Sequence, residues 1–229
     1  MENRYTFDVI ARVRTPFAEK FGIPRQSGLA AGVNGAIVFE DAFRKPEALR
    51  GLDGFSHIWL LWCFSQHAEK DWQPTVRPPR LDGSSRLGVF ATRSPFRPNP
   101  IGLSLVRLDG INLETPEGPI LWVSGPDLLD GTPLFDIKPY LPYTDCHPEA
   151  RSGFVAENEW TSLEVEIPPA LLAKIPAEQQ AALYEVLSQD PRPAYHKDPD
   201  RVYGLSFAGR NVRFTVQDGV VRVSQVDLL

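Results

Sequence analysis

The stretch GVFATRSPFRPNPIGLS, at residues 88–104, restricts the fold more than any other part of the chain. Its prolines fix φ and withhold backbone donors, so they predict an irregular, extended loop between a strand at residues 87–92 and an apolar strand after it. Arg93 and Arg97 are then held in fixed positions. We expect Arg97, between Phe96 and Pro98, to lie on the exposed crest of the loop, and Arg93, directly after the strand, to be the more buried of the two. Rigid guanidinium groups suit a carboxylate or a phosphate, because little entropy is lost on binding. The same residues also fit a structural proline loop with two solvated arginines.

Short apolar or alternating segments flank this loop and predict strands. They lie at residues 7–13, 35–39, 55–64, 104–110 and 119–124. The segment FSHIWLLWCF at 55–64 is apolar throughout, which predicts a strand buried on both faces. Residues 125–145 are rich in turn formers, and we expect them to be irregular. Short strands joined by long loops are typical of a β-barrel or sandwich whose loops carry the function.

The pattern changes near residue 161. Residues 177–189 place apolar side chains on one helical face, and segments at 203–207, 212–216 and 220–226 alternate as strands do, with Asp218-Gly219 as a hairpin signal. We therefore predict a mainly β protein, with a β-barrel domain at residues 1–160 and a small C-terminal α+β domain at residues 161–229.

Composition is that of a soluble globular protein, with 42% hydrophobic and 23% charged residues among 229. No apolar run is long enough to span a bilayer, and the first residues lack a signal peptide's apolar centre, so we expect no membrane association. Cys63 and Cys146 form no disulfide framework. We expect reduced thiols and a cytoplasmic protein.

The formal net charge is −5, yet residues 77–97 hold five arginines, including Arg77, Arg80 and Arg86, and a single acid, Asp82. A basic island on an acidic protein favours docking of a phosphate-bearing ligand in one orientation. The alternative is that folding scatters these arginines over different faces.

Common catalytic motifs are missing from the sequence. It has no GxGxxG after a strand, no GxxxxGK[ST], no HExxH and no GxSxG, and its four histidines are too scattered to predict a metal site. The residues alone therefore predict an anion-binding or nucleotide-binding β domain.

The run GVFATRSPFRPN at 88–99 resembles the signature of the TsaA/YaeB-like, or TrmO, family of tRNA methyltransferases. Further blocks resemble that family in its order, namely IPRQ at 23–26, GLDGFSHIW at 51–59, RPPR at 77–80, DLLDGTP at 127–133, DIKPY at 136–140 and QDPRPAY at 189–195.

The resemblance implies a β-barrel enzyme that uses S-adenosyl-L-methionine and works as a homodimer. Its substrate would be threonine tRNA, held by the anticodon stem-loop, and it would methylate the N6 nitrogen of threonylcarbamoyladenosine beside the anticodon. A β-barrel enzyme of this family would not carry the glycine-rich dinucleotide-binding motif, which agrees with its absence here. The basic island at residues 77–97 would bind the phosphates of the stem-loop.

By their positions in these motifs, the resemblance implies a cofactor pocket made of Gln26, Ser27, Gly28, Gln66, Arg93, Leu103, Asp127, Leu128, Asp130, Gly131 and Thr132. Asp127 or Asp130 would pair with the cofactor's ammonium group or ribose hydroxyls. The alternative is that both aspartates cap the turn before Thr132.

For the substrate side, we expect Asp136 to accept the proton that the nitrogen loses. We expect Lys138 to pair with the threonyl carboxylate. We also expect Tyr140 or Tyr143 to stack on a base of the tRNA, and Arg86, Arg97 and Asn99 to contact the RNA backbone.

Two other functions fit the residues: a module that senses S-adenosyl-L-methionine or a nucleotide without turnover, and a barrel that only binds RNA. Because the cofactor motifs end before residue 145, we also expect the barrel to fold and to bind cofactor without the C-terminal domain.

Overall fold

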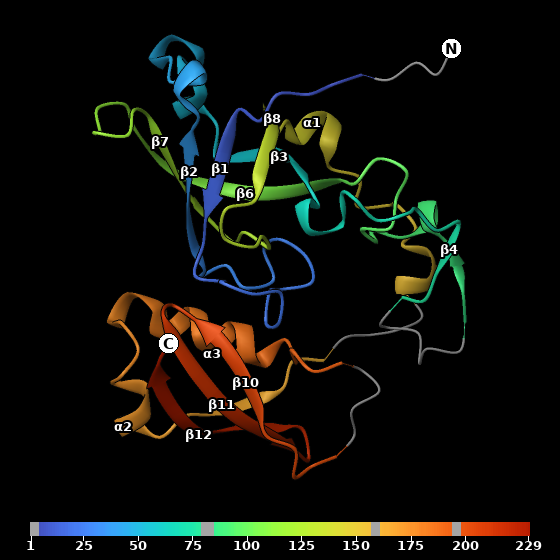
Figure 1. The fold of residues 1–229 in the computed structure, drawn as a ribbon, viewed down its shortest axis with the longest axis vertical. Helices are drawn as coiled ribbons and strands as arrows, with labels where there is room; N and C mark the ends of the chain where they lie inside the picture. The colour runs from blue at the N-terminus through green and yellow to red at the C-terminus, as the bar shows by residue number, and fades with distance from the viewer. Residues whose placement is uncertain (1–4, 79–84, 157–160, 194–197) are drawn as a thin grey trace.

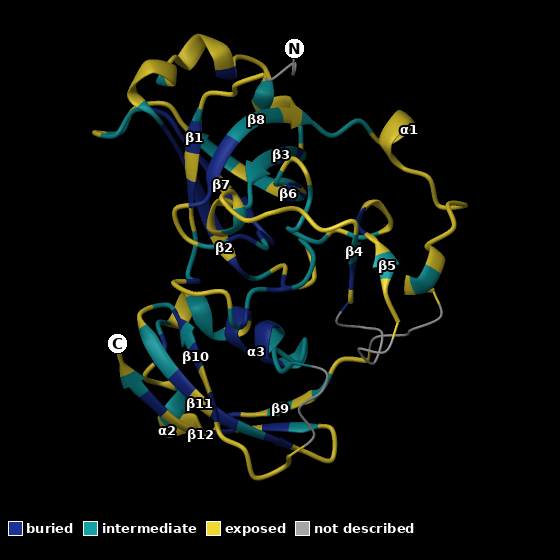
Figure 2. Ribbon diagram, turned by 45° about the vertical axis from the view of Figure 1, so that its right-hand side comes forward, coloured by how far each residue is buried: buried dark blue, intermediate teal, exposed yellow. Residues whose placement is uncertain are grey.

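The computed structural model describes residues 5–78, 85–156, 161–193 and 198–229 (Figure 1). It contains a closed barrel in the N-terminal half and a separate four-stranded sheet in the C-terminal half. Figure 2 shows a buried interior in each half. The predicted mainly β fold, with a barrel and a small C-terminal α+β domain, is confirmed. Arg80 and Asp82 of the basic island lie outside the described residues.

The barrel closes in the order β1-β2-β7-β6-β3-β8. Its strands are β1 (Ala11–Arg14), β2 (Asn34–Phe39), β3 (His57–Cys63), β6 (Ile101–Asn112), β7 (Ile120–Ser124) and β8 (Pro133–Pro139). A small hairpin of β4 (Thr75–Val76) and β5 (Leu87–Gly88) lies outside it. Short 3₁₀ helices at Asp41–Phe43, Pro46–Leu49, Leu52–Gly54, Ser65–His67 and Val89–Ala91 fill the connections.

Strand β3 is not buried on both faces, contrary to the sequence prediction. Ile58 and Leu60 point into the barrel and are fully buried, whereas Trp59 and Leu61, which alternate with them, are half-buried. The reason is that a closed barrel covers only its inner face, so an outer apolar residue stays partly exposed.

The predicted strand at 87–92 is also wrong beyond Gly88. The chain turns into the 3₁₀ helix Val89–Ala91, and the Thr92 hydroxyl donates to the Val89 carbonyl over 2.8 Å, which stabilises the turn. As the prolines require, the following loop is irregular, and strand β6 begins at Ile101.

Strand β8 lies inside the stretch expected to be irregular. It pairs with β1 on one side and with β3 on the other, which closes the barrel. Its Leu134 side chain is fully buried in the core. The pairing offered by two neighbouring strands therefore overrides a local sequence rich in turn formers.

The C-terminal sheet has the order β10-β11-β12-β9, with β9 parallel to β12. Its strands are β9 (Glu164–Glu166), β10 (Tyr203–Phe207), β11 (Arg210–Gln217) and β12 (Val220–Leu228). The helices are α1 (Pro142–Asp145), α2 (Pro169–Leu172) and α3 (Gln180–Ser188), and short 3₁₀ turns lie at Gly153–Val155 and Ala177–Gln179. Asp218 and Gly219 both have positive φ, as the predicted hairpin needs.

The long connection between β1 and β2, residues 15–33, packs into the C-terminal core. The Phe17 side chain is fully buried there, with its ring centroid 5.7 Å from that of Phe207. The Phe21 ring stacks on Tyr203, and the Gly32 amide donates to Glu185 Oε2 over 2.7 Å. The two cores thus share this connection.

In the described parts of the chain, the helices are too short or too polar to cross a lipid bilayer.

Candidate functional site

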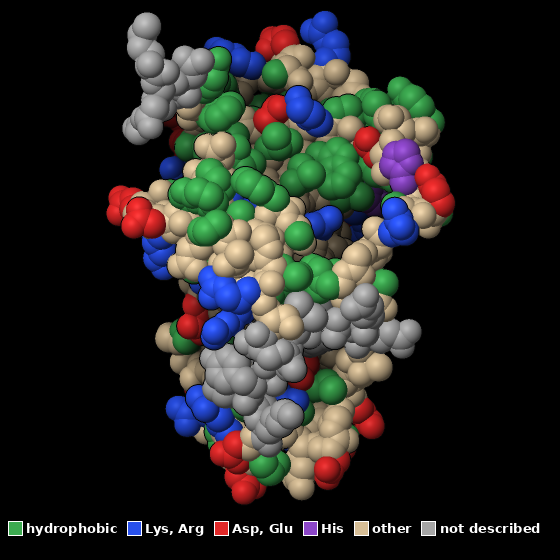
Figure 3. Space-filling view, turned by 90° about the vertical axis from the view of Figure 1, so that its right-hand side faces the viewer, with side chains coloured by type: hydrophobic (Ala, Val, Ile, Leu, Met, Phe, Trp, Pro, Cys, Tyr) green, Lys and Arg blue, Asp and Glu red, His purple; other side chains and the backbone are tan. Residues whose placement is uncertain are grey.

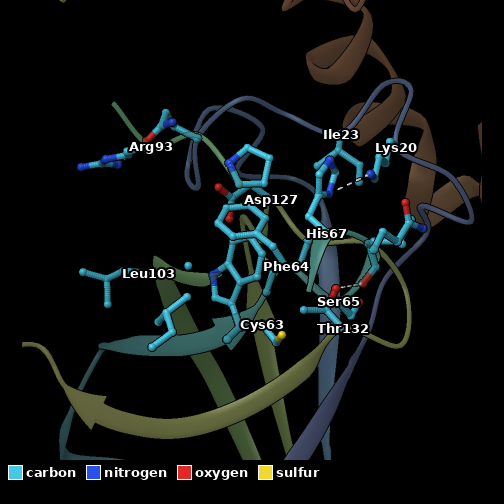
Figure 4. Close-up of a pocket in the computed structure, with 18 of the residues that line it drawn as sticks. Lys20, Ile23, Cys63, Phe64, Ser65, His67, Arg93, Leu103, Asp127 and Thr132 are labelled. Atoms are coloured by element: carbon cyan, nitrogen blue, oxygen red, sulfur yellow. Dashed lines mark hydrogen bonds between the residues drawn. The ribbon is translucent and has the colours of Figure 1, made fainter. Parts of the chain in front are cut away.

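A cavity of about 500 Å³ lies beside the barrel, against strands β3 and β6 (Figure 4). Five segments line it: the β1–β2 connection, β3 with the residues after it, the proline loop, the start of β6, and the turn that precedes β8. Of the predicted site residues, it brings together Gln26, Gln66, Arg93, Arg97, Leu103, Asp127, Leu128 and Thr132. Trp62 and Phe64 add aromatic walls.

A hydrogen-bonded chain leads from β3 to Asp127. The Trp62 indole nitrogen donates to Ser104 Oγ over 3.0 Å, and that hydroxyl donates to Asp127 Oδ1 over 2.6 Å. Gly102 faces Trp62 across the strands, and a Cβ there would come within 2.2 Å of the indole. Glycine at 102 is therefore what allows the indole to lie across β6 and reach Ser104.

Burial raises the pKa of the Asp127 carboxyl above its ordinary value. The Ser104 hydroxyl, the amides of Asp127 and Ser27, and the positive charge of Arg93 favour the ionised form, but they do not outweigh the loss of solvation. A carboxylate held in this way gains most from a ligand that carries positive charge into the cavity.

Ser27 and Gly28 position the loop and are not part of the cavity wall. Ser27 Oγ accepts from the Leu105 amide over 3.2 Å, and the Gly28 amide donates to the Gly125 carbonyl over 2.9 Å. Gly28 has φ of +79°, which favours glycine. The result is that Gln26 faces the cavity, where its Oε1 accepts from Arg93.

The turn after Asp127 is fixed by its own residues. Asp130 Oδ1 accepts from the Thr15 amide over 3.0 Å, and the Thr132 hydroxyl donates to the Leu129 carbonyl over 2.7 Å. Leu128 lies in the barrel core, and Gly131, with φ of +74°, makes the turn. Asp130 and Gly131 do not line the cavity, and Asp130 binds the β1–β2 connection at Thr15, whereas Asp127 faces the cavity.

The two arginines of the proline loop are exposed in the reverse of the expected order. Arg97 is half-buried, and its Nη1 donates to the carbonyls of Thr92 and Val89 over 2.7 and 3.1 Å. Arg93 is the exposed one and contacts Gln26. The expectation of Arg97 on an exposed crest is wrong, because its guanidinium closes the turn made by residues 89–92.

This geometry predicts different losses at the two arginines. Arg97→Ala removes partly buried hydrogen bonds, so we expect unfolding free energy to fall by about 1–3 kcal/mol and ligand affinity to fall with it. Arg93→Ala should leave the melting temperature unchanged. Thermal unfolding and calorimetric titration with S-adenosyl-L-methionine measure both. An Arg97→Ala variant of unchanged stability, with a tRNA-binding salt slope reduced by about one, would restore the phosphate role.

Apart from Arg97, the residues expected to contact the substrate do not line this cavity within one chain. Lys138 Nζ lies 2.7 Å from Asp136 Oδ2, and both belong to the outer part of β8. Arg86 is bound to Thr75 in the β4–β5 hairpin, and Tyr143 on α1 is 86% exposed. Asn99 is exposed in the proline loop, and the Tyr140 ring packs beside Trp59.

Sequence reasoning missed several residues of the cavity wall, namely Lys20, Arg25, Trp62, Phe64 and His67. Arg25 belongs to the IPRQ block, Lys20 lies shortly before it, and His67 follows Gln66 directly, so proximity to a predicted residue is the available signal. Trp62 was read only as part of an apolar strand.

The fold and the cavity define a class: a β-barrel domain with a ligand cavity bounded by its loops, joined to a small α+β domain. Residues 12–146 match the model of the tRNA-methyltransferase O N-terminal domain, and residues 161–228 match the TrmO C-terminal domain. The chain belongs to the TrmO family, and the resemblance drawn from its motifs is confirmed.

Individual relatives agree with the family models. The chain is 43% identical to the tRNA (adenine(37)-N6)-methyltransferase of Escherichia coli strain K12, over 93% of this chain and 94% of that protein. It is 47% identical to the protein of that name from Eikenella corrodens, over 75% of this chain and 97% of that one. The crystal structure of TrmO from Pseudomonas aeruginosa superposes with a TM-score of 0.78 at 35% identity, covering 98% of this chain and 99% of that one.

Proposed function

We propose that this chain is an S-adenosyl-L-methionine-dependent tRNA (adenine37-N6)-methyltransferase. The observation that carries the proposal is the buried Asp127 carboxyl in a cavity with aromatic walls, found in a chain that matches this family over both halves. The substrate we propose is threonine tRNA that carries threonylcarbamoyladenosine.

The residues of the cavity fit this cofactor. It is a cation with a flat base, and Asp127, whose pKa is raised by burial, would gain from a nearby positive charge. Leu103, which is 54% exposed, and the rings of Trp62 and Phe64 offer apolar contact to a base. Gln26 and Arg93 would hold its polar end. These contacts set orientation and exclude water, which is the main requirement for in-line transfer.

When bound, the cofactor supplies a methyl group that is already activated by its positive sulfur. The chain then has to align the accepting nitrogen and take up its proton. Within one chain Asp136 lies outside the cavity, so we propose that it serves as proton acceptor toward the cavity of a second copy.

The outer face of the barrel supports this homodimer. Trp59 pairs with Leu105 and Leu61 with Leu103 across β3 and β6, which places four apolar side chains on the outer surface. Figure 3 shows hydrophobic side chains gathered on one face of the N-terminal half. Leu103 also lines the cavity, so a copy seated on this face would cover the cavity's edge. We propose that the protein works as such a homodimer in the cytoplasm, where tRNA is modified.

Methyl transfer decides between an enzyme and a binding module. The protein is incubated with labelled S-adenosyl-L-methionine and total tRNA, and the tRNA is digested to nucleosides. We expect label in one nucleoside, methylated threonylcarbamoyladenosine, and only from threonine tRNA. Cofactor binding without label in any nucleoside would favour the sensing module, and tRNA binding without cofactor binding would favour the RNA-binding barrel.

A further inference from the structure

One edge of the cavity carries positive charge that the described residues do not neutralise. Lys20 lines the cavity from the β1–β2 connection, and the charge that acts on its ammonium group is that of Lys70. Among the described residues, the Lys20 ammonium hydrogen-bonds only to Nδ1 of His67, at 3.2 Å. Figure 4 shows this pair on the side of the cavity away from Arg93.

His67 is suited to hold the lysine in place. Its ring stands edge-on to Phe96, with centroids 5.1 Å apart, which fixes the ring plane. Burial first, and then Lys20 and Lys70, lower the pKa of His67, so near neutral pH its Nδ1 accepts a hydrogen bond from the ammonium. An ammonium group has three donors, so the other two remain for a ligand.

Burial, and then the charge of Lys70, also lower the pKa of Lys20. An anion placed beside this ammonium would raise the pKa of Lys20 again, and the same attraction between opposite charges would bind the anion. Lys20 and Arg25 also line a second cavity, of about 420 Å³, which reaches the ion pair of Arg192 with Asp190 after α3. An anion attached to a base in the first cavity therefore meets a positively charged edge, whereas the Asp127 side suits a cation.

We propose that Lys20, positioned by His67, forms the anion subsite of this cavity and binds an oxyanion of the RNA substrate. The oxyanion is either the carboxylate on the modified base or a phosphate of the RNA backbone. This inference rests on the proposed function, and it replaces Lys138, whose ammonium is engaged by Asp136.

The test uses two anticodon stem-loops, one with threonylcarbamoyladenosine and one with the threoninol analogue, which lacks the carboxylate. Lys20→Met removes the charge at similar length, and Lys20→Arg keeps it. Lys45→Met, at an exposed lysine beside the 3₁₀ helix Pro46–Leu49, is the matched control. Stem-loop binding is followed by fluorescence anisotropy across a salt series, and methyl transfer gives KM and kcat.

If the subsite takes the carboxylate, Lys20→Met should weaken binding of the threonyl stem-loop by about tenfold to a hundredfold and leave the threoninol stem-loop unchanged. If it takes a phosphate, both stem-loops should weaken equally and the salt slope should fall by about one. Unchanged binding of both stem-loops, or a loss equal to that of Lys45→Met, would overturn the proposal.

His67 has its own readout as a positioning residue. His67→Asn keeps an acceptor near the position of Nδ1 and should retain wild-type KM, whereas His67→Phe should raise KM with little change in kcat. Equal effects of the two variants would overturn this role. Failure of the proposed function can be distinguished from failure of this inference. In that case the wild-type chain would methylate neither stem-loop, while the anisotropy measurements would still test the role of Lys20 in binding.

Discussion

Replacement of Asp127 by asparagine is expected to weaken binding of S-adenosyl-L-methionine by about tenfold to a hundredfold while making the protein more stable. A buried contact between opposite charges is worth about 1.5–3 kcal/mol, which corresponds to this loss in Kd. The free energy of unfolding should rise, because burial raises the pKa of the Asp127 carboxyl and its ionised form therefore destabilises the native state. Asparagine keeps an oxygen for the Ser104 hydroxyl and carries no charge.

The pH dependence of this gain has a definite sign. A raised native pKa means that the native state binds the proton more tightly than the unfolded state, so ionisation of Asp127 costs stability. The cost is absent below the unfolded pKa and grows as pH rises through the native pKa. The melting temperatures of wild type and Asp127→Asn should therefore coincide in acid and separate on the way to neutral pH. Cofactor affinity of the wild type should fall as pH is lowered through the same window.

Calorimetric titration and differential scanning calorimetry across pH measure both effects. Asp41→Asn serves as the control, because that side chain is 89% exposed in its ion pair with Arg44. It should change neither cofactor affinity nor the melting temperature by much. An Asp127→Asn protein that binds the cofactor as the wild type does would show that this carboxylate does not contact it.

Truncation of Phe17 to alanine is expected to cost about 3–5 kcal/mol of unfolding free energy, a large share of the stability of a domain. Phe17 belongs to the β1–β2 connection, yet it is fully buried among C-terminal residues and packs on Phe207. The same change should weaken cofactor binding, because Gln26, farther along this connection, lines the cavity.

Phe7→Ala provides the comparison, since that ring is 63% exposed. Denaturant unfolding of both variants gives the free energies, and titration gives the affinities. If Phe17→Ala lost stability but bound the cofactor normally, the cavity would be ordered by the barrel alone. The earlier expectation for the isolated barrel would then stand.

The sequence predicts correctly those secondary-structure elements that are determined by residues close together in the chain. The prolines before Pro100 end regular structure and allow β6 to begin at Ile101, and Asp218-Gly219 forms the hairpin that its residue types favour. Strand β8 escaped prediction because its residues favour turns, and it exists only through pairing with β1 and β3.

The sequence likewise predicts some residues of the site and not others. Asp127 followed from a motif, and the structure adds its neighbours: Trp62 and Ser104 lie on different strands and reach it only after the barrel has closed. Lys20 and His67 are 47 residues apart, in separate loops. No periodicity in the sequence links two such residues, because tertiary packing alone brings them together.

The burial of Phe17 in the C-terminal core also sets the order of events during synthesis. A ribosome adds about 5–20 residues per second, so on the order of ten seconds or more separates the appearance of Phe17 from that of its partners Leu205 and Phe214. Once β8 is complete, the nascent chain has its barrel strands but not yet the C-terminal surface that receives the Phe17 ring. The connection that carries Gln26 therefore gains this packing only after the barrel strands have been made.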